Sequence, residues 1–86
     1  MNFDQYEALP WQDVDSSNIR RVALVEGPEE TEHGTLYIEF HGGRAYSYAD
    51  VPDETFEELI AAESVTSYFN AEIKTEFETS RVQVTR

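Results

Sequence analysis

The chain has 86 residues, of which 18 are Asp or Glu and six are Lys or Arg, so its formal net charge is −12. This length fits one small domain with a modest core, since chains of this size bury only about 60–65% of their unfolded surface. The chain has no cysteine, which excludes disulfides and thiolate metal sites. No apolar run approaches the roughly 18 residues of a membrane span, and the N-terminus lacks a signal-peptide pattern. We therefore expect a soluble, cytoplasmic protein without a cofactor.

The acidity limits the classes of partner. An acidic surface repels nucleic acid and anionic lipid at ordinary salt. The one lysine, Lys74, stands against five arginines. This composition is compatible with a halophilic source, because concentrated salt screens such a surface, and equally with an ordinary acidic soluble protein.

The first 13 residues are interpreted as an N-terminal extension. Phe3, Tyr6 and Leu9 have the spacing of a short helical turn, which Pro10 would end. We expect these aromatic residues to cap the core. Asp15 to Asn18 is turn chemistry, because such side chains bond their own backbone.

Ile19 to Glu26 is predicted as the first strand. Arg20 and Arg21 interrupt its alternation, which indicates a bulge or an edge position. Gly27 to Gly34 is predicted as a polar loop rich in glutamate.

Thr35 to Phe40 and Arg44 to Ala49 are predicted to pair as a hairpin, and its register is open. If Gly42 and Gly43 form a two-residue turn, Tyr46 and Tyr48 are exposed and could stack with bases. If the loop has three residues and Gly43 is left-handed, Phe40 lies opposite Arg44. The two tyrosines then join Leu36, Ile38 and Phe40 on the core face. We favour the second register, because it gives the helices a continuous apolar surface.

Two helices are predicted to follow. Val51 and Pro52 lead into the first, which has acidic residues in its first turn. Ser64 is placed to cap the second, whose apolar stripe has a four-residue spacing. The apolar positions are Phe56, Leu59 and Ile60 in the first helix, and Val65, Phe69, Ile73 and Phe77 in the second. Arg81 to Thr85 alternates, which is compatible with a short final strand. The predicted fold class is α+β: a three-stranded antiparallel meander, then two helices packed on one sheet face.

The order of these elements resembles the KTSC domain, a short module found at the C-terminus of some lysyl-tRNA synthetases and as a stand-alone protein in bacteria and phages. The resemblance spans residues 14–77 and leaves residues 78–86 as a C-terminal extension. The matching segments are Val14-Asp15-Ser16-Ser17 with Ile19, Leu36 to Phe40, Gly43, Tyr46-x-Tyr48, Val51-Pro52, Ala62-x-Ser64, Tyr68-Phe69-Asn70 and Ile73-Lys74. The chain departs from the family at Val65-Thr66, where a glycine is usual.

The resemblance implies a small non-catalytic binding module that touches RNA or a partner protein. The family has no established activity, and RNA binding is suggested mainly by the synthetase context. We expect Tyr46 and Tyr48 to contribute hydroxyls at the rim of the core.

Two further groups of residues are candidates for binding. Asn70 and Lys74 lie one helical turn apart and could contact a phosphate or carboxylate, unless Lys74 pairs with a glutamate such as Glu78. Arg20, Arg21 and Arg44 could converge into a small basic island, because arginine binds phosphate bidentately. Solvated arginines that offset carboxylates are the other interpretation.

Enzymatic activity and a metal site have little support. His33 and His41 lack a third ligand at a recognisable spacing, and no serine lies in a nucleophile turn. The acidic run supplies a second function hypothesis, a nucleic-acid mimic or inhibitor that would suit a phage protein. Its residues are Glu26, Glu29, Glu30 and Glu32 with the glutamates of the first helix. A solvated acidic face is the alternative.

Overall fold

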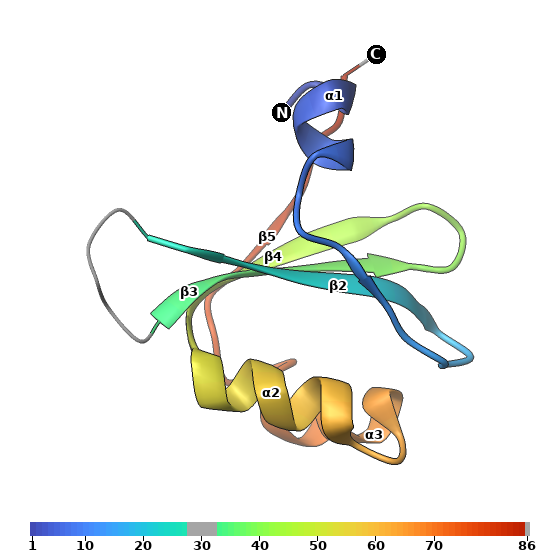
Figure 1. The fold of residues 1–86 in the computed structure, drawn as a ribbon, viewed down its shortest axis with the longest axis vertical. Helices are drawn as coiled ribbons and strands as arrows, with labels where there is room; N and C mark the ends of the chain where they lie inside the picture. Colours follow the sequence, from blue (N-terminus) through green and yellow to red (C-terminus); the bar gives the residue numbers. More distant parts are fainter. Residues whose placement is uncertain (28–32, 86) are drawn as a thin grey trace.

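The computed structural model describes residues 1–27 and 33–85 as an α+β fold built on a five-stranded antiparallel sheet with strand order β1-β2-β3-β4-β5. Helices α2 and α3 lie on one side of the sheet and α1 lies on the other (Figure 1). In chain order the elements are α1 (Phe3–Glu7), β1 (Gln12–Asp13), β2 (Ile19–Glu26), β3 (His33–Phe40), β4 (Ala45–Pro52), α2 (Asp53–Ala61), α3 (Val65–Glu72) and β5 (Thr79–Arg81).

The α+β class is confirmed, but four strands rather than the predicted three precede helices α2 and α3, because β1 pairs with β2. The possible final strand is present as β5, which pairs with β4. Strand β1 has two residues, both exposed, and β5 has three exposed residues. Neither strand has the alternating apolar residues by which a half-buried strand is recognised in a sequence. Both are held at the edges of the sheet by backbone pairing. The final strand also begins earlier than expected, at Thr79 rather than Arg81.

The β3–β4 hairpin has the three-residue loop that we favoured. Glu39 pairs with Ala45 and Ile38 with Tyr46, so the ladder places Phe40 opposite Arg44. The amide of Phe40 donates to the carbonyl of Arg44 at 2.8 Å. Gly42 and Gly43 have φ of 104° and 92°, in the region that favours glycine.

Two bulges reshape the long strands. The register of β2 on β3 shifts between Ile19 and Arg21, which confirms the predicted interruption. The register of β3 on β4 shifts between Gly34 and Leu36, where Asp50 of β4 has a φ of 55°. Through this second bulge the hairpin continues to His33, so Gly34 belongs to a strand and not to the predicted loop.

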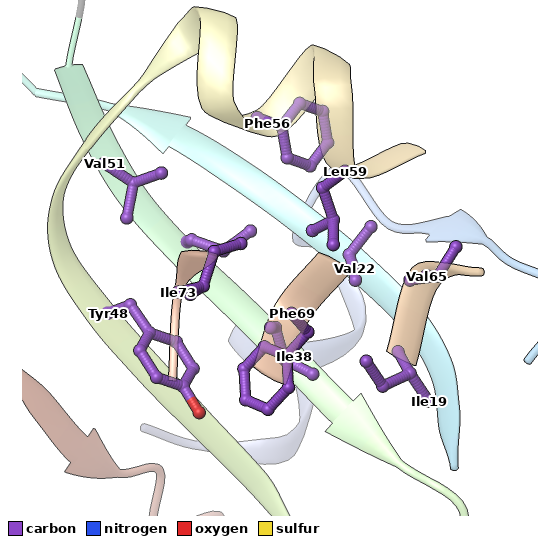
Figure 2. Close-up of a cluster of buried hydrophobic side chains, with 11 residues drawn as sticks. Ile19, Val22, Ile38, Tyr48, Val51, Phe56, Leu59, Val65, Phe69 and Ile73 are labelled. Atoms are coloured by element: carbon purple, nitrogen blue, oxygen red, sulfur yellow. The ribbon is translucent and has the colours of Figure 1, made fainter. Parts of the chain in front are cut away.

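The main core lies between the sheet and helices α2 and α3 (Figure 2). Ser64 caps α3 as predicted, because its hydroxyl accepts from the amide of Ser67 at 3.2 Å. Pro52 is the N-cap residue of α2. The buried members are Ile19, Val22, Leu36, Ile38, Tyr48, Val51, Phe56, Leu59, Val65, Phe69 and Ile73. The predicted apolar residues of both helices and of β3 therefore do pack in or against this core, although α3 ends at Glu72, so Ile73 and Phe77 follow the helix instead of belonging to it.

The N-terminal aromatic residues cover the opposite face of the sheet. Helix α1 is the predicted turn; Tyr6 is 5% exposed and packs against Trp11 with ring centroids 5.1 Å apart. They form a second, smaller cluster rather than a cap on the main core. Asn2 forms a parallel bridge with Thr85, so the two ends of the described chain lie together (Figure 1). Among the described residues, no helix has the length and apolar character needed to cross a bilayer.

Candidate binding groove

An open groove of about 600 Å³ lies on the helix side of the sheet, near the hairpin turn. Four segments form it: the loop before β2, the β3–β4 hairpin, α3 with the residues after it, and β5. Volumes of this size are typical of sites that hold a small molecule or one group of a larger ligand. We call this feature the groove.

Aromatic side chains line the groove. Phe40 contacts Tyr46 edge to face with centroids 5.9 Å apart, and it contacts Phe69 at 5.7 Å. Tyr48 contacts Phe69 in the same way at 5.6 Å. The hairpin register causes this arrangement, because it turns Tyr46 and Tyr48 to the face that carries Phe40. The groove thus has an apolar wall suited to a ring or an aliphatic group.

Tyr48 lines this groove with a side chain that is almost fully buried. Tyr48 is 4% exposed, and its hydroxyl makes no hydrogen bond to any residue that the structure describes. Figure 2 shows the hydroxyl directed away from Val51. Burial, and then the neighbouring Tyr46, raises the pKa of Tyr48 to about 12. The group is therefore a neutral hydroxyl at physiological pH, free to donate to or accept from a ligand.

Hydrogen bonds hold the rim of the groove together. The hydroxyls of Ser16 and Thr66 lie 2.5 Å apart, which joins the loop before β2 to the first turn of α3. His41 Nε2 lies 3.0 Å from the carbonyl of Ser16, and the His41 amide donates to the carbonyl of Asn18 at 2.9 Å. The loop is thus bonded to both the hairpin turn and α3, and the rim is preorganised.

The charges of the groove are opposite to those of the chain. Arg44 and Lys74 line it, and none of its thirteen lining residues is Asp or Glu, although these make up 18 of the 86 residues. Neither cation makes an ion pair with any residue in the described part of the chain, so the predicted alternative of a Lys74–Glu78 pair is not formed. With two cations that have no partner among the described residues and no carboxylate in its lining, the groove has a local positive charge on an acidic chain.

Five of the seven candidate binding residues line the groove: Tyr46, Tyr48, Asn70, Lys74 and Arg44. The two others, Arg20 and Arg21, do not line it, so the three arginines do not form one island. Sequence reasoning placed Phe40 and Phe69 only in the core and read Ser17 and Asn18 only as a turn. The polar residues Ser17 and Asn18 in the turn and Thr66 and Asn70 in α3 line the groove together. Nothing in the sequence predicts that these two segments meet, because their proximity depends on the tertiary fold.

Arg21 takes part in a polar network on the opposite sheet face. Its guanidinium donates to both carboxylate oxygens of Glu39 at 3.0 Å and to Glu7 at 2.9 Å, and it lies 4.4 Å from the ring centroid of Trp11. The Tyr6 hydroxyl donates to the same Glu39 carboxylate. Arg20 also approaches this carboxylate, at 3.6 Å. These two arginines therefore offset carboxylates instead of forming part of the groove.

The network shifts the pKa values of its members. Burial would raise the pKa of Glu39, but the bonds from Arg21 and Tyr6 outweigh it and lower that pKa. Burial and the bond to Glu39 raise the pKa of Tyr6. Burial opposes the charge of Arg21, yet its bonds to Glu7 and Glu39 give a net rise in its pKa. Glu39, only 5% exposed, is therefore a buried carboxylate held ionised by its partners.

The histidines and acidic candidates lie elsewhere. His33 and His41 stand at opposite ends of β3, and within the described ranges no cluster of three or more ligating side chains could hold a metal ion. Of the acidic run, Glu26 is exposed at the end of β2, whereas Glu29, Glu30 and Glu32 lie outside the described residues. The glutamates of α2 that face solvent are Glu54, Glu57 and Glu58.

Comparison with known proteins supports the fold and the family. A curated protein of Tsukamurella paurometabola, whose name states no function, is 43% identical over 42 residues; the match covers 49% of this chain and 63%, less than two thirds, of that protein. The crystal structure of a KTSC domain protein from Yersinia pestis superposes with a TM-score of 0.73 at 26% identity, over 88% of this chain and 100% of that one. The model of the KTSC domain matches residues 15–77. The resemblance seen in the sequence is thus confirmed, and the chain belongs to the KTSC domain family.

Proposed function

We propose that the protein is a small non-catalytic binding module that takes one anionic group of a macromolecular partner, RNA or protein, into the groove. The observation that carries this proposal is the charge of the groove. Arg44 and Lys74 have no ion-pair partner, and the hydroxyl of Tyr48 no hydrogen-bond partner, among the described residues, and the lining holds no carboxylate. Because an unpaired cation is unusual where carboxylates are three times as numerous, a ligand is the expected partner.

The groove supports binding rather than catalysis. His41, the one histidine in its lining, bonds the carbonyl of Ser16, and none of its hydroxyls is paired with a general base. The acidic surface favours the second candidate, a nucleic-acid mimic, through the exposed glutamates of α2. We give it the second place, because dispersed carboxylates are also the usual surface of an acidic protein.

The proposal is tested by titrating ¹⁵N-labelled protein and following its amide resonances. The two probes are a single-stranded oligouridylate and a short basic peptide with a free C-terminal carboxylate. We expect at least one probe to shift resonances of Asn70, Lys74 and the hairpin, and Lys74→Gln or Arg44→Gln to weaken that response at least fivefold. Arg20→Gln removes the same charge outside the groove and should leave the response unchanged. If neither probe shifts groove resonances, or if all three variants behave alike, the proposal fails.

A further inference from the structure

We infer that the group bound in the groove is the C-terminal carboxylate of a protein partner, with the partner's last residues lying along the edge of β5. This inference rests on the proposed function, since it names the ligand of the same groove. Two independent features carry it: the distribution of charge around the groove, and the free sheet edge beside it.

The first feature is that the groove holds two cations and no carboxylate, whereas the chain on both sides of Lys74 is acidic. Glu72, Glu76 and Glu78 flank Lys74 and Thr79 along the chain, all three are exposed, and none of them lines the groove. At physiological salt, charges act over about 8 Å, so Glu78, the chain neighbour of the groove residue Thr79, acts on a ligand that leaves the groove on that side. A nucleic acid carries a further negative charge on every nucleotide and would be repelled there. The end of a polypeptide carries one carboxylate preceded by neutral amides, which fits a groove that has two cations and exposed glutamates beside it.

The second feature is the edge strand. Strand β5 has one neighbour in the described sheet, β4, and its three residues Thr79–Arg81 are all exposed. Thr79 also lines the groove, so the edge leads into it. An exposed edge offers backbone donors and acceptors to a further strand, and an extended peptide can pair with them. RNA has no alternating amide donors and carbonyl acceptors with which to pair in this way.

The groove can hold both parts of a C-terminal residue. Arg44 presents a planar guanidinium that binds a carboxylate with two parallel bonds, and Lys74 adds a second charge. The buried ring of Tyr48 brings a neutral hydroxyl to the same space. The edge-to-face wall of Phe40 and Phe69 suits an apolar last side chain. The exposed Glu76 and Glu78 outnumber Arg81 in and beside β5, so this edge would favour a basic tail.

The test uses the full chain and short random-sequence peptides displayed with free C-termini. We expect selection to enrich peptides with an apolar last residue. A synthetic copy of the strongest peptide should bind at least tenfold more tightly than its C-terminal amide, measured by calorimetry. Arg44→Gln and Lys74→Gln should weaken binding at least fivefold, and Arg20→Gln should not. Replacing the upstream residues of the peptide by Lys should strengthen binding, and replacing them by Glu should weaken it.

The outcomes separate this inference from the proposed function. If no peptide is enriched, or if the amide binds as well as the acid, the inference is overturned. If in addition oligouridylate binds the groove in a manner that requires Lys74, the proposed function stands with RNA as its ligand. If neither peptide nor oligouridylate binds, both proposals fail.

Discussion

Phe40 lies directly opposite Arg44 across the β3–β4 hairpin, joined by a bond from the Phe40 amide to the Arg44 carbonyl at 2.8 Å. This pairing sets the register of the whole hairpin, because side chains alternate between the two faces. It turns Tyr46 and Tyr48 toward α3 and places Arg44 at the mouth of the groove. A slip of one residue would turn both tyrosines to the other face, so the turn determines whether the groove exists.

The turn should be sensitive to a side chain at Gly43. This residue has a φ of 92°, and a Cβ built on it meets no atom within 4 Å, so the penalty of Gly43→Ala is conformational and not steric. A residue other than glycine in the left-handed region loses about 1–2 kcal/mol. We expect chemical denaturation to show a loss of stability of about 1 kcal/mol. Gly27→Ala is the matched control, because Gly27 has equal space and no positive φ. Equal stabilities of the two variants would contradict the assignment of the turn.

Gly34 should be sensitive to a side chain for a steric rather than a conformational reason. A Cβ on Gly34 would lie 2.6 Å from the carbonyl oxygen of Val25, a backbone atom of the neighbouring strand. Strands β2 and β3 would have to separate locally, and such overpacking typically destabilises by about 1–3 kcal/mol. We expect Gly34→Ala to lower the free energy of unfolding by about 2 kcal/mol against the same Gly27→Ala control. A change below about 0.5 kcal/mol would show that the strands do not approach as closely as the structure has them.

The sequence was sufficient for the elements that bury an apolar face. The alternation of β3, the stripe of α3 and the Ser64 cap follow from local chemistry, and all three are confirmed. Strand β1 could not be found in this way, and β5 was placed too late in the chain, since both are short and exposed. The sequence indicates a loop at Gly34, because this glycine follows a polar run. The structure shows why β3 has a glycine there: the backbone of Val25 lies too close to leave room for a Cβ.

The same limit applies to the groove. Tyr46 and Tyr48 are candidates because their hydroxyls are expected at the rim of the core, and Asn70 and Lys74 because their spacing is one helical turn. Arg44 was selected for another reason, a supposed cluster with Arg20 and Arg21. The bulge after Ile19 and the pairing of Arg21 with the buried Glu39 separate these arginines, and neither can be inferred from spacing. The absence of carboxylates from the groove is likewise a property of the tertiary structure.

Two buried tyrosines should respond differently to the loss of a hydroxyl. The Tyr6 hydroxyl donates to the buried carboxylate of Glu39, whereas that of Tyr48, which lines the groove, has no partner in the described structure. A bond to a charged group contributes about 1.5–3 kcal/mol, so Tyr6→Phe should destabilise by about 2 kcal/mol. Tyr48→Phe should change stability by less than about 0.5 kcal/mol, because no bond to a described residue is lost.

The measurement is thermal or chemical denaturation of both variants beside the wild type. Binding provides the second half of the comparison: Tyr48→Phe should weaken any ligand that the groove holds, and Tyr6→Phe should not. A Tyr48→Phe variant that is as unstable as Tyr6→Phe would show that the hydroxyl has a structural partner instead of an open position.

The carboxylate of Glu39 should make stability depend on pH. Glu39→Gln leaves the guanidinium of Arg21, whose side chain is 15% exposed, without its buried partner. Breaking a buried pair in this way destabilises by about 3–5 kcal/mol, so we expect a loss near the lower end, about 3 kcal/mol at pH 7, because Arg21 keeps its bond to Glu7. The measurement is urea denaturation of the variant and the wild type at a series of pH values.

The direction of the pH effect follows from the lowered pKa of Glu39. The folded state binds a proton at this carboxyl less readily than the unfolded state, in which a glutamate has a pKa of about 4.3. The contribution of Glu39 is therefore complete above that pH and is lost as the pH falls through the lower pKa of the folded state. The stability gap between wild type and Glu39→Gln should be constant from pH 7 to 5 and should narrow below about pH 4. Glu63→Gln, an exposed change outside the network, should show no gap at any pH. If the difference in stability between wild type and Glu39→Gln is unchanged at pH 3, Glu39 stabilises the fold through its packing and not through its ion pair with Arg21.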